Sequence, residues 1–171
     1  MTTTRIIETA IDDKGDAYVF SDKQQAGWEM LGHTITDLFF SKQSPPDMLM
    51  TNEEIENKNF NLKPGQIRFF RSDILPTKAL YDNLHPDEKS KDFKDFFYHS
   101  TTTVDFIIIT KGELVLFVGD KERIVKAGDV VVQRGASHAW HNYTNDIATI
   151  MGVMIGAELP RQFKRIDTVQ P

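Results

Sequence analysis

The pattern of hydrophobic and polar positions divides most of this chain into short runs rich in β-branched and aromatic residues. These runs are separated by glycine, proline and aspartate, the residues that supply tight turns. Clear examples are residues 17–20, 35–40, 66–71, 113–118 and 147–155. Short runs at this spacing are typical of a sandwich or barrel, so we expect an all-β protein.

Residues 86–97 depart from this pattern and predict a short helix. Pro86 suits the first helical position, and acidic residues follow in the first turn. An apolar stripe at i, i+3 and i+4 then comprises Phe93, Phe96 and Phe97. We expect the stripe to pack on the wall of the β-structure. The alternative is a lid, because the segment leads directly into His99.

The run at 104–110 is apolar on both faces. Asp105, Ile107 and Ile109 share one face, which we expect to point inward, and Val104, Phe106 and Ile108 share the other. A strand of this kind is covered on both sides. The cover is predicted to come from the N-terminal segment or from a second copy of the chain.

Composition limits the classes of function. The 171 residues suggest one domain, and a net charge of −5 with scattered basic residues argues against a nucleic-acid partner. The absence of cysteine excludes disulfides, thiolate zinc sites and cysteine nucleophiles. The longest apolar run, 147–157, is too short to cross a bilayer, and residues 1–5 lack a signal-peptide core. We therefore expect a cytoplasmic protein without a membrane partner.

The stretch 128–142 is the most informative part of the chain. Its residues read G-D-V-V-V-Q-R-G-A-S-H-A-W-H-N, a glycine turn, a short strand, a second glycine and then a histidine. Strand alternation puts His138, Trp140 and Asn142 on one face. The stretch resembles the second motif of the cupin superfamily, although Gln133-Arg134 replaces the usual proline.

A second stretch, 99–119, resembles the first cupin motif, H-x-H-x-x-x-E followed by an apolar strand and a glycine turn. Thr101 stands where that motif has its second histidine, and Asp105 replaces its glutamate. A cupin subgroup that reads H-x-T-x-T-x-D-[YF] and G-D-V-V-V-Q-R-G-x-x-H-x-W is similar over both stretches. The resemblance covers about a quarter of the chain.

The resemblance implies a cupin-type double-stranded β-helix, a jelly-roll barrel, with a short helix and an N-terminal arm. We expect the arm at residues 1–34, the barrel at 35–157 and a C-terminal tail at 158–171. No internal repeat is present, so one barrel is expected. Cupins often dimerise by exchanging N-terminal strands, which implies a homodimer with an interface near Ile6, Ile7 and residues 17–20.

The resemblance also implies a metal site formed by His99, Asp105 and His138. Two imidazoles and a carboxylate suit one divalent transition metal, such as Fe, Mn, Ni, Co or Zn, and leave positions open for substrate. Asp105 is the candidate proton carrier, Thr101 a hydrogen-bonding group and Trp140 an apolar wall. A pocket without metal, in which the same side chains hydrogen-bond a ligand, is the alternative.

Further residues are candidates for binding the substrate. Thr103, Ile107, Trp140 and Asn142 share the inward face of their strands, although Asn142 would also suit a structural role at the next turn. Arg68 could supply an interior positive charge or lie at the surface. Three histidines are weaker candidates. His85 is expected in a loop, His33 before a strand, and His141 on the outward face of its strand.

These observations lead to two hypotheses on function. In the first, the chain is a metal-dependent enzyme that acts on a small oxygenated or carboxylated molecule as a dioxygenase, decarboxylase, isomerase or lyase. In the second, it binds a small molecule without catalysis. Sensor cupins usually carry a helix-turn-helix domain, and no such domain is expected here. Fold alone does not choose among these reactions.

Overall fold

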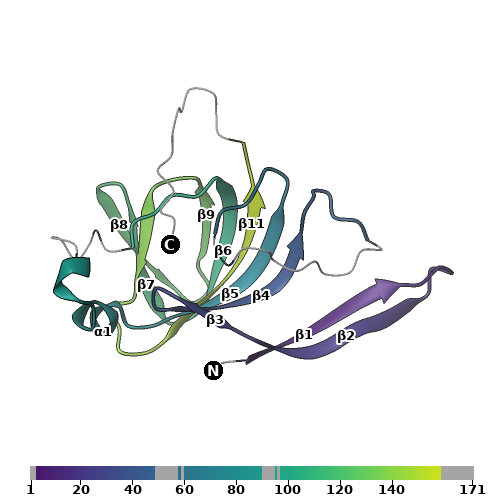
Figure 1. Ribbon diagram of the computed structural model, residues 1–171, viewed down its shortest axis with the longest axis horizontal. Coiled ribbons are helices and arrows are strands. Elements are labelled where there is room, and N and C mark those ends of the chain that lie inside the picture. The colour runs from purple at the N-terminus through teal and green to yellow at the C-terminus, as the bar shows by residue number, and fades with distance from the viewer. Residues whose placement is uncertain (1–2, 49–57, 59, 90–94, 96, 159–171) are drawn as a thin grey trace.

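The computed structural model describes residues 3–48, 58, 60–89, 95 and 97–158, and it shows the expected all-β fold (Figure 1). Its largest unit is an antiparallel sheet of six strands. In spatial order these are β3 (Trp28–Met30), β4 (His33–Ser41), β5 (Ile67–Ile74), β11 (Ala148–Gly156), β6 (Thr103–Lys111) and β9 (Val130–Arg134). A smaller sheet of three strands contains β10 (His138–His141), β7 (Glu113–Val118) and β8 (Lys121–Lys126).

The two sheets enclose one hydrophobic core. Members of the core come from both sheets and include Ile35, Phe70, Ile109, Leu114 and Trp140. A jelly-roll barrel of the cupin type therefore describes the main body of the protein. The sheets meet at an isolated bridge between His99 and His138, just before β6 begins and where β10 begins.

The inward and outward faces of β6 are those that the sequence predicts. Asp105, Ile107 and Ile109 are at most 3% exposed, whereas Phe106 and Ile108 are 45% and 48% exposed. The turn from β6 to β7 depends on Gly112, whose φ of 78° lies in the left-handed region. A side chain there would also meet Ala148 at 3.1 Å.

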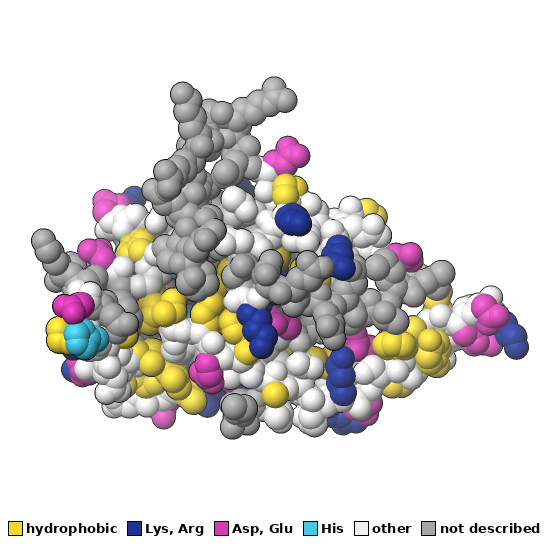
Figure 2. All heavy atoms as spheres, viewed as in Figure 1, with side chains coloured by type: hydrophobic (Ala, Val, Ile, Leu, Met, Phe, Trp, Pro, Cys, Tyr) yellow, Lys and Arg dark blue, Asp and Glu magenta, His cyan; other side chains and the backbone are white. Residues whose placement is uncertain are grey.

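The expected N-terminal arm divides into two parts. β1 (Thr3–Ile11) and β2 (Ala17–Ala26) form a separate hairpin that projects away from the barrel (Figure 1). Residues 28–30, by contrast, pair with β4 as the edge strand of the large sheet. The hairpin carries exposed hydrophobic side chains, which include Ile7, Tyr18, Val19 and Phe20. Figure 2 shows a group of hydrophobic side chains on this part of the molecule, short of its charged tip.

The helical segments differ from the prediction. A six-residue helix that was not predicted, α1 (Thr77–Asp82), follows β5. The predicted helix at 86–97 begins as a single 3-10 turn, η1 (Pro86–Glu88). Phe93 and Phe96 lie outside the described residues. Phe97 has a left-handed φ of 73°, which a continuing helix does not allow, and its ring contacts those of His33 and His141.

No helix among the described residues is long and apolar enough to cross a membrane. The outward face of the large sheet is apolar where β6 and β9 pair, because Val130 and Val132 of β9 lie beside Phe106 and Ile108 of β6 and are 63% and 50% exposed. An exposed apolar surface of this kind commonly marks an interaction site. The homodimer stays a prediction that this surface supports.

We predict that light scattering at micromolar concentration gives twice the chain mass of 19.6 kDa. Phe106→Glu should shift the protein to a monomer, because it places a charge in the apolar face that a second copy would cover. Lys121→Glu, at the start of β8 in the small sheet, serves as the control and should leave the mass unchanged. A wild-type protein that runs as a monomer would contradict the prediction.

Candidate functional site

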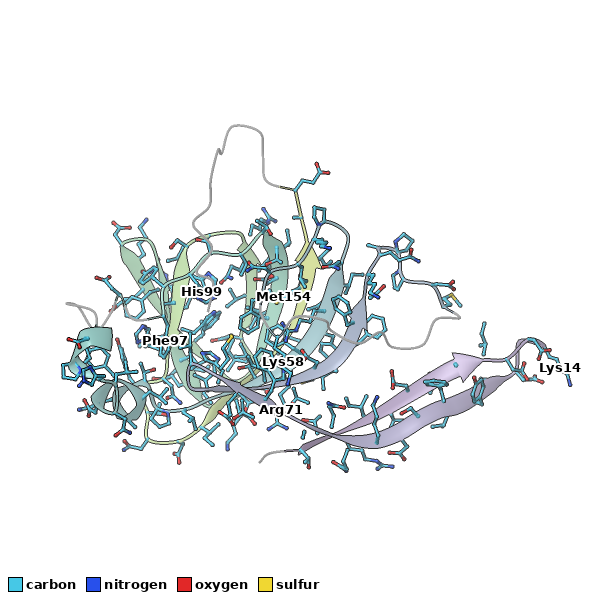
Figure 3. All side chains as sticks on the ribbon, viewed as in Figure 1. Lys14, Lys58, Arg71, Phe97, His99 and Met154 are labelled. Carbon is cyan, nitrogen blue, oxygen red and sulfur yellow. The ribbon has the colours of Figure 1, made fainter. Side chains whose placement is uncertain are left out.

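A small cavity of about 50 Å³ lies inside the barrel between the two sheets. Six of the predicted site residues line it, namely His99, Thr101, Asp105, Ile107, His138 and Trp140. The rest of its lining comprises His33, Phe60, Phe70, Ser72, Gln133, Ile150 and Met154. In Figure 3, the labelled His99 and Met154 both lie within the barrel.

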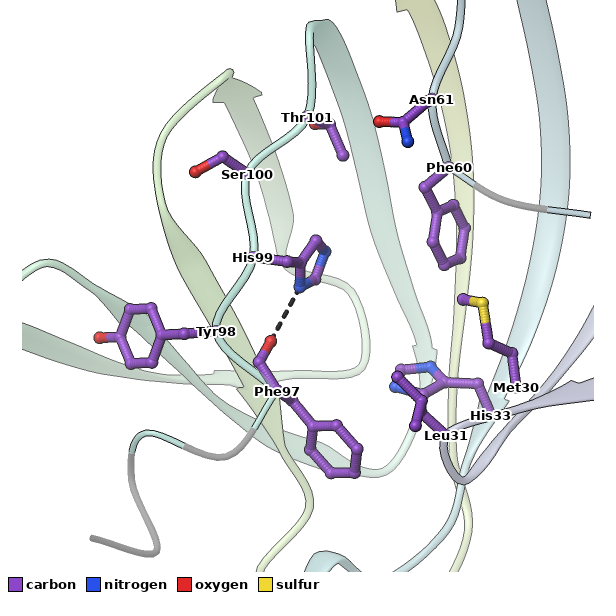
Figure 4. Close-up of a pocket in the computed structure, with 10 residues that line it drawn as sticks. All are labelled: Met30, Leu31, His33, Phe60, Asn61, Phe97, Tyr98, His99, Ser100 and Thr101. Atoms are coloured by element: carbon purple, nitrogen blue, oxygen red, sulfur yellow. Dashed lines mark hydrogen bonds between the residues drawn. The ribbon is translucent and has the colours of Figure 1, made fainter. Parts of the chain in front are cut away.

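The two predicted histidine ligands are oriented in the same way. The ring of His99 hydrogen-bonds through Nδ1 to the carbonyl of Phe97 at 2.8 Å, shown in Figure 4, and His138 bonds through Nδ1 to Ala136 at 2.7 Å. A carbonyl only accepts, so each Nδ1 carries the proton and each Nε2 keeps a lone pair. The two ring centres lie 4.2 Å apart.

Gln133 stands between the predicted carboxylate and one predicted imidazole. Its Nε2 donates to Asp105 Oδ2 at 3.1 Å and lies 3.0 Å from His138 Nε2. Because His138 Nε2 holds a lone pair, the amide donates a hydrogen to each partner. The arrangement follows from register, since Asp105 of β6 pairs directly with Gln133 of β9.

Burial changes the acid–base properties of this cluster. It raises the pKa of Asp105 to about 6, although hydrogen bonds from Thr103 and Gln133 act in the opposite direction. It lowers the pKa of His138 to about 3, assisted by the neighbouring His99, whose own pKa burial also lowers. The imidazoles are therefore neutral at physiological pH, the form that binds metals.

The two threonines extend the polar cluster. The hydroxyls of Thr101 and Thr103 lie 2.7 Å apart, and both residues are buried. Thr101 borders the cavity, and Thr103 supports Asp105 from the side. Thr101, which replaces the second histidine of the motif, therefore borders the cavity with its hydroxyl bonded to that of Thr103.

His33 was underestimated from the sequence, where it appeared only as a weak candidate before a strand. It is the first residue of β4, lines the cavity and bonds through Nδ1 to the hydroxyl of Ser72 at 3.0 Å. Burial, together with the charge of His99, lowers its pKa to about 4. A third neutral imidazole thus faces the site.

Arg68 is fully buried, so the surface alternative for this residue is wrong. Its Nε donates to Asp37 Oδ1 at 2.7 Å, and its guanidinium group lies over aromatic rings that include Trp28 and Phe60. Trp28 Nε1 donates to the other oxygen of Asp37 at 2.9 Å. The charge of Arg68 is thereby satisfied within the protein, and Arg68 is not among the residues that line the cavity.

Asn142 acts in a turn and does not line the interior cavity. Its amide nitrogen donates to the carbonyls of Ile74 and Asp146, and its Oδ1 accepts from Thr144. This structural role was the alternative that the sequence left open. His141 faces away from the cavity as predicted, yet it is fully buried beneath aromatic side chains that include Phe97, Phe117 and Tyr143.

Whether these residues fit a metal depends on Gln133. As placed, no three histidine, aspartate or glutamate side chains of the described residues lie close enough together to hold one ion. Two buried acceptors in the described part of the site, Asp105 Oδ1 and Gln133 Oε1, nevertheless have no hydrogen-bond donor. Unpaired buried oxygens beside two imidazole lone pairs form a donor set that suits a divalent transition metal.

The spacing explains why the set is incomplete. The Gln133 nitrogen lies about 3 Å from both Asp105 and His138. Ligands of a zinc-sized ion lie about 2.0–2.2 Å from the metal. The donor atoms of these residues therefore suit a divalent metal ion. The amide of Gln133 must move, however, before Asp105 and His138 can bind the same ion.

Gln133 was overlooked as a functional residue in the sequence, although one signal was present. Along β9 the inward positions are Val131 and Gln133, so a polar side chain enters the barrel opposite Asp105. In the sequence it was noted only as a replacement for a proline.

Comparison with known proteins adds a family match. The model of the family described as "Cupin domain" matches residues 83–155. The "Cupin-domain-containing oxidoreductase srdD" of Neurospora crassa is 30% identical over 141 residues, which are 78% of this chain and 59% of that protein. "Oryzines biosynthesis cluster protein J" of Aspergillus oryzae is 52% identical over 46 residues, 26% of each chain.

A third relative, the "Cupin-domain-containing oxidoreductase virC" of Hypocrea virens, is 40% identical over 58 residues, 33% of this chain and 29% of that protein. This chain thus covers less than two thirds of each of the three relatives. Among solved structures, a putative ethanolamine utilization protein Q from Salmonella typhimurium is 14% identical with a TM-score of 0.47. That alignment covers 92% of this chain and 100% of the other.

The lowered histidine pKa values predict a loss of stability in mild acid. In an unfolded chain, histidine side chains take up protons near pH 6.5. In the folded state His138 stays neutral down to about pH 3 and His33 down to about pH 4. The free energy of unfolding should therefore fall as the pH drops from 6.5 to 4.5, by up to about 1 kcal/mol per pH unit for each histidine. The raised pKa of Asp105 has the opposite effect on stability, because the folded state takes up this proton first, and it offsets the loss only below about pH 6.

Urea titrations at several pH values measure this slope. His138→Gln should make the slope shallower, because it removes one group that protonates only on unfolding. His85→Gln, at an exposed position outside the site, is the matched control and should leave the slope unchanged. An equal slope in the wild type and His138→Gln would contradict the assignment.

Proposed function

Since this chain belongs to the cupin superfamily, with its cupin domain at residues 83–155, we propose that it is a metal-dependent cupin enzyme that acts on a small oxygenated molecule. The observation that carries the proposal is the common orientation of His99 and His138. Both Nδ1 protons are engaged by carbonyls, which turns both Nε2 lone pairs toward one buried cavity beside Asp105.

His99, His138 and Asp105 would hold the ion. A divalent metal there would supply Lewis acidity and, if it is iron, the ability to activate dioxygen. Two relatives are named oxidoreductases, which favours oxidation–reduction as the reaction class for this chain. Another relative is named for a biosynthesis cluster, which favours a role in making a small molecule.

The other residues of the cavity would orient the substrate and move a proton. A carboxylate oxygen of Asp105 that does not hold the ion could take a proton from a bound hydroxyl group. The hydroxyl of Thr101 can donate to or accept from a substrate oxygen. Trp140 and Ile107 form apolar walls that exclude water from the reacting group.

A second candidate is a binding protein without metal, and the bridge made by Gln133 favours it. In that form the amide already satisfies one oxygen of Asp105 and the lone pair of His138. The remaining acceptors, Asp105 Oδ1 and Gln133 Oε1, would then receive hydrogen bonds from a ligand. The two candidates differ in whether a metal displaces the amide.

Calorimetric titration of protein purified without a nickel column tests the proposal. One equivalent of at least one of Fe(II), Mn(II), Ni(II) and Zn(II) should bind. His138→Ala should weaken that binding at least tenfold, because it removes one of three ligands. His85→Ala is the control for adventitious binding at an exposed histidine. Failure of all four ions would reject the metal enzyme in favour of the second candidate.

The position of Gln133 generates a separate prediction. Gln133→Ala should bind the same ion roughly tenfold more tightly, because the metal no longer has to break two hydrogen bonds to displace the amide. Circular dichroism checks that the variant keeps its fold. The Kd of Gln133→Ala for the ion is then compared with that of the wild type, both from the same calorimetric titration. Weaker binding by Gln133→Ala would show that the amide supports the ion and does not compete with it.

A further inference from the structure

Two cavities adjoin at the mouth of the barrel and give the site an outer and an inner compartment. The outer cavity, shown in Figure 4, has a volume of about 180 Å³, and the inner cavity has about 50 Å³. Their linings have four residues in common, namely His33, Phe60, His99 and Thr101. One molecule can therefore occupy both, with a bulky part in the outer cavity and a small group in the inner one.

We propose that the outer cavity binds an uncharged, ring-sized apolar group, and that one small polar substituent such as a hydroxyl reaches the inner cavity. The inference rests on the proposed function, because it assigns the substrate class of the same site. For the protein without a bound ion, it narrows the expected ligand, which was oxygenated or carboxylated, to an oxygenated molecule without a carboxylate or phosphate.

The volume of the outer cavity suits a single ring. An apolar cavity of about 150 Å³ in another protein binds benzene. A cavity of about 180 Å³ therefore accommodates a six-membered ring with a small additional group. The inner cavity, at about 50 Å³, has room for a hydroxyl or carbonyl group and not for a second ring.

The wall of the outer cavity is mainly apolar. Met30, Leu31, Phe60 and Phe97 surround it, and Figure 4 shows the ring of Phe60 and the sulfur of Met30 on the side opposite His99. The rings of Phe60 and His99 are nearly parallel, with centres 6.5 Å apart and an angle of 21°. Flat apolar groups gain from contact with such faces.

The described lining of the two compartments disfavours anions in the protein without a bound ion. No lysine or arginine is among the described residues that line either cavity. Arg68, the nearby candidate cation, is fully buried against Asp37 and beneath the rings of Trp28, Phe60 and Phe70. In the protein without a bound ion, a carboxylate that moved from water into the inner cavity would lie beside Asp105 without a counter-charge, which is costly.

Two matched probes test the inference, 4-methylphenol and 4-methylbenzoate, which share a methyl-substituted ring and differ in charge at neutral pH. Each is titrated calorimetrically into full-length protein that has been treated with a chelator. We expect the phenol to bind at least tenfold more tightly than the benzoate. Equal affinities, the reverse order, or no binding of the phenol would overturn the inference.

A charge introduced at the outer wall provides a second test. Leu31 lines the outer cavity and is 55% exposed, so Leu31→Lys should fold normally and add a cation at the mouth. This variant should bind 4-methylbenzoate at least fivefold more tightly than the wild type does, and its preference for the phenol should be smaller. Ile124→Lys, on exposed β8 outside both linings, is the control. A Leu31→Lys protein with unchanged affinities would also overturn the inference.

These titrations contain no metal and measure no turnover, so their failure is distinct from failure of the proposed enzyme. A chain that prefers the phenol but binds none of the four metal ions keeps the substrate class and loses the metal-dependent function. A chain that binds a metal ion but shows no preference for the phenol keeps the proposed function and loses the substrate class.

Discussion

The pair of main-chain hydrogen bonds between His99 and His138 sets the geometry of the site. Each residue donates its amide to the carbonyl of the other at 2.9 Å, and this bridge joins the segment before β6 to β10 of the small sheet. Each ring then bonds to the carbonyl two residues before it. The backbone of both strands therefore fixes the tautomer, the ring orientation and the separation of the two imidazoles.

Desolvation is the second constraint, and it acts on every polar group that faces the cavity. It raises the pKa of Asp105 and lowers that of His33, His99 and His138, so burial disfavours the charged form of each. Gln133 is a neutral bridge that satisfies part of this cluster without adding charge. The oxygens it leaves unpaired are the reason that the cluster is suited to a cation or a hydrogen-bonding ligand.

The barrel separates its two strongly polar interior features. The ion pair of Arg68 and Asp37 lies among aromatic rings that include Trp28 and Phe60, and it is closed off from the inner cavity. The imidazole cluster also adjoins Phe60, whose ring lies nearly parallel to that of His99 and which borders both cavities. Phe60 thus contacts both the guanidinium group of Arg68 and the ring of His99, and we propose that the burial of the Arg68 charge outside the cavity favours uncharged molecules.

The sequence by itself determined the all-β class, the inward face of β6 and the strand face that carries His138 and Trp140. These follow from the period of two along a strand, which needs no knowledge of its neighbours. The cupin motifs also identified His99, Asp105 and His138 as residues of one site.

Only the tertiary structure decided which side chains oppose one another. Register places Gln133 beside Asp105, and the pairing of β4 with β5 brings His33 to Ser72, 39 positions away in the chain. The charge of Arg68 is likewise satisfied by Asp37 from the neighbouring strand. Strand alternation fixes the face of a residue but not its cross-strand partner, because the partner depends on how separate strands align in the folded sheet.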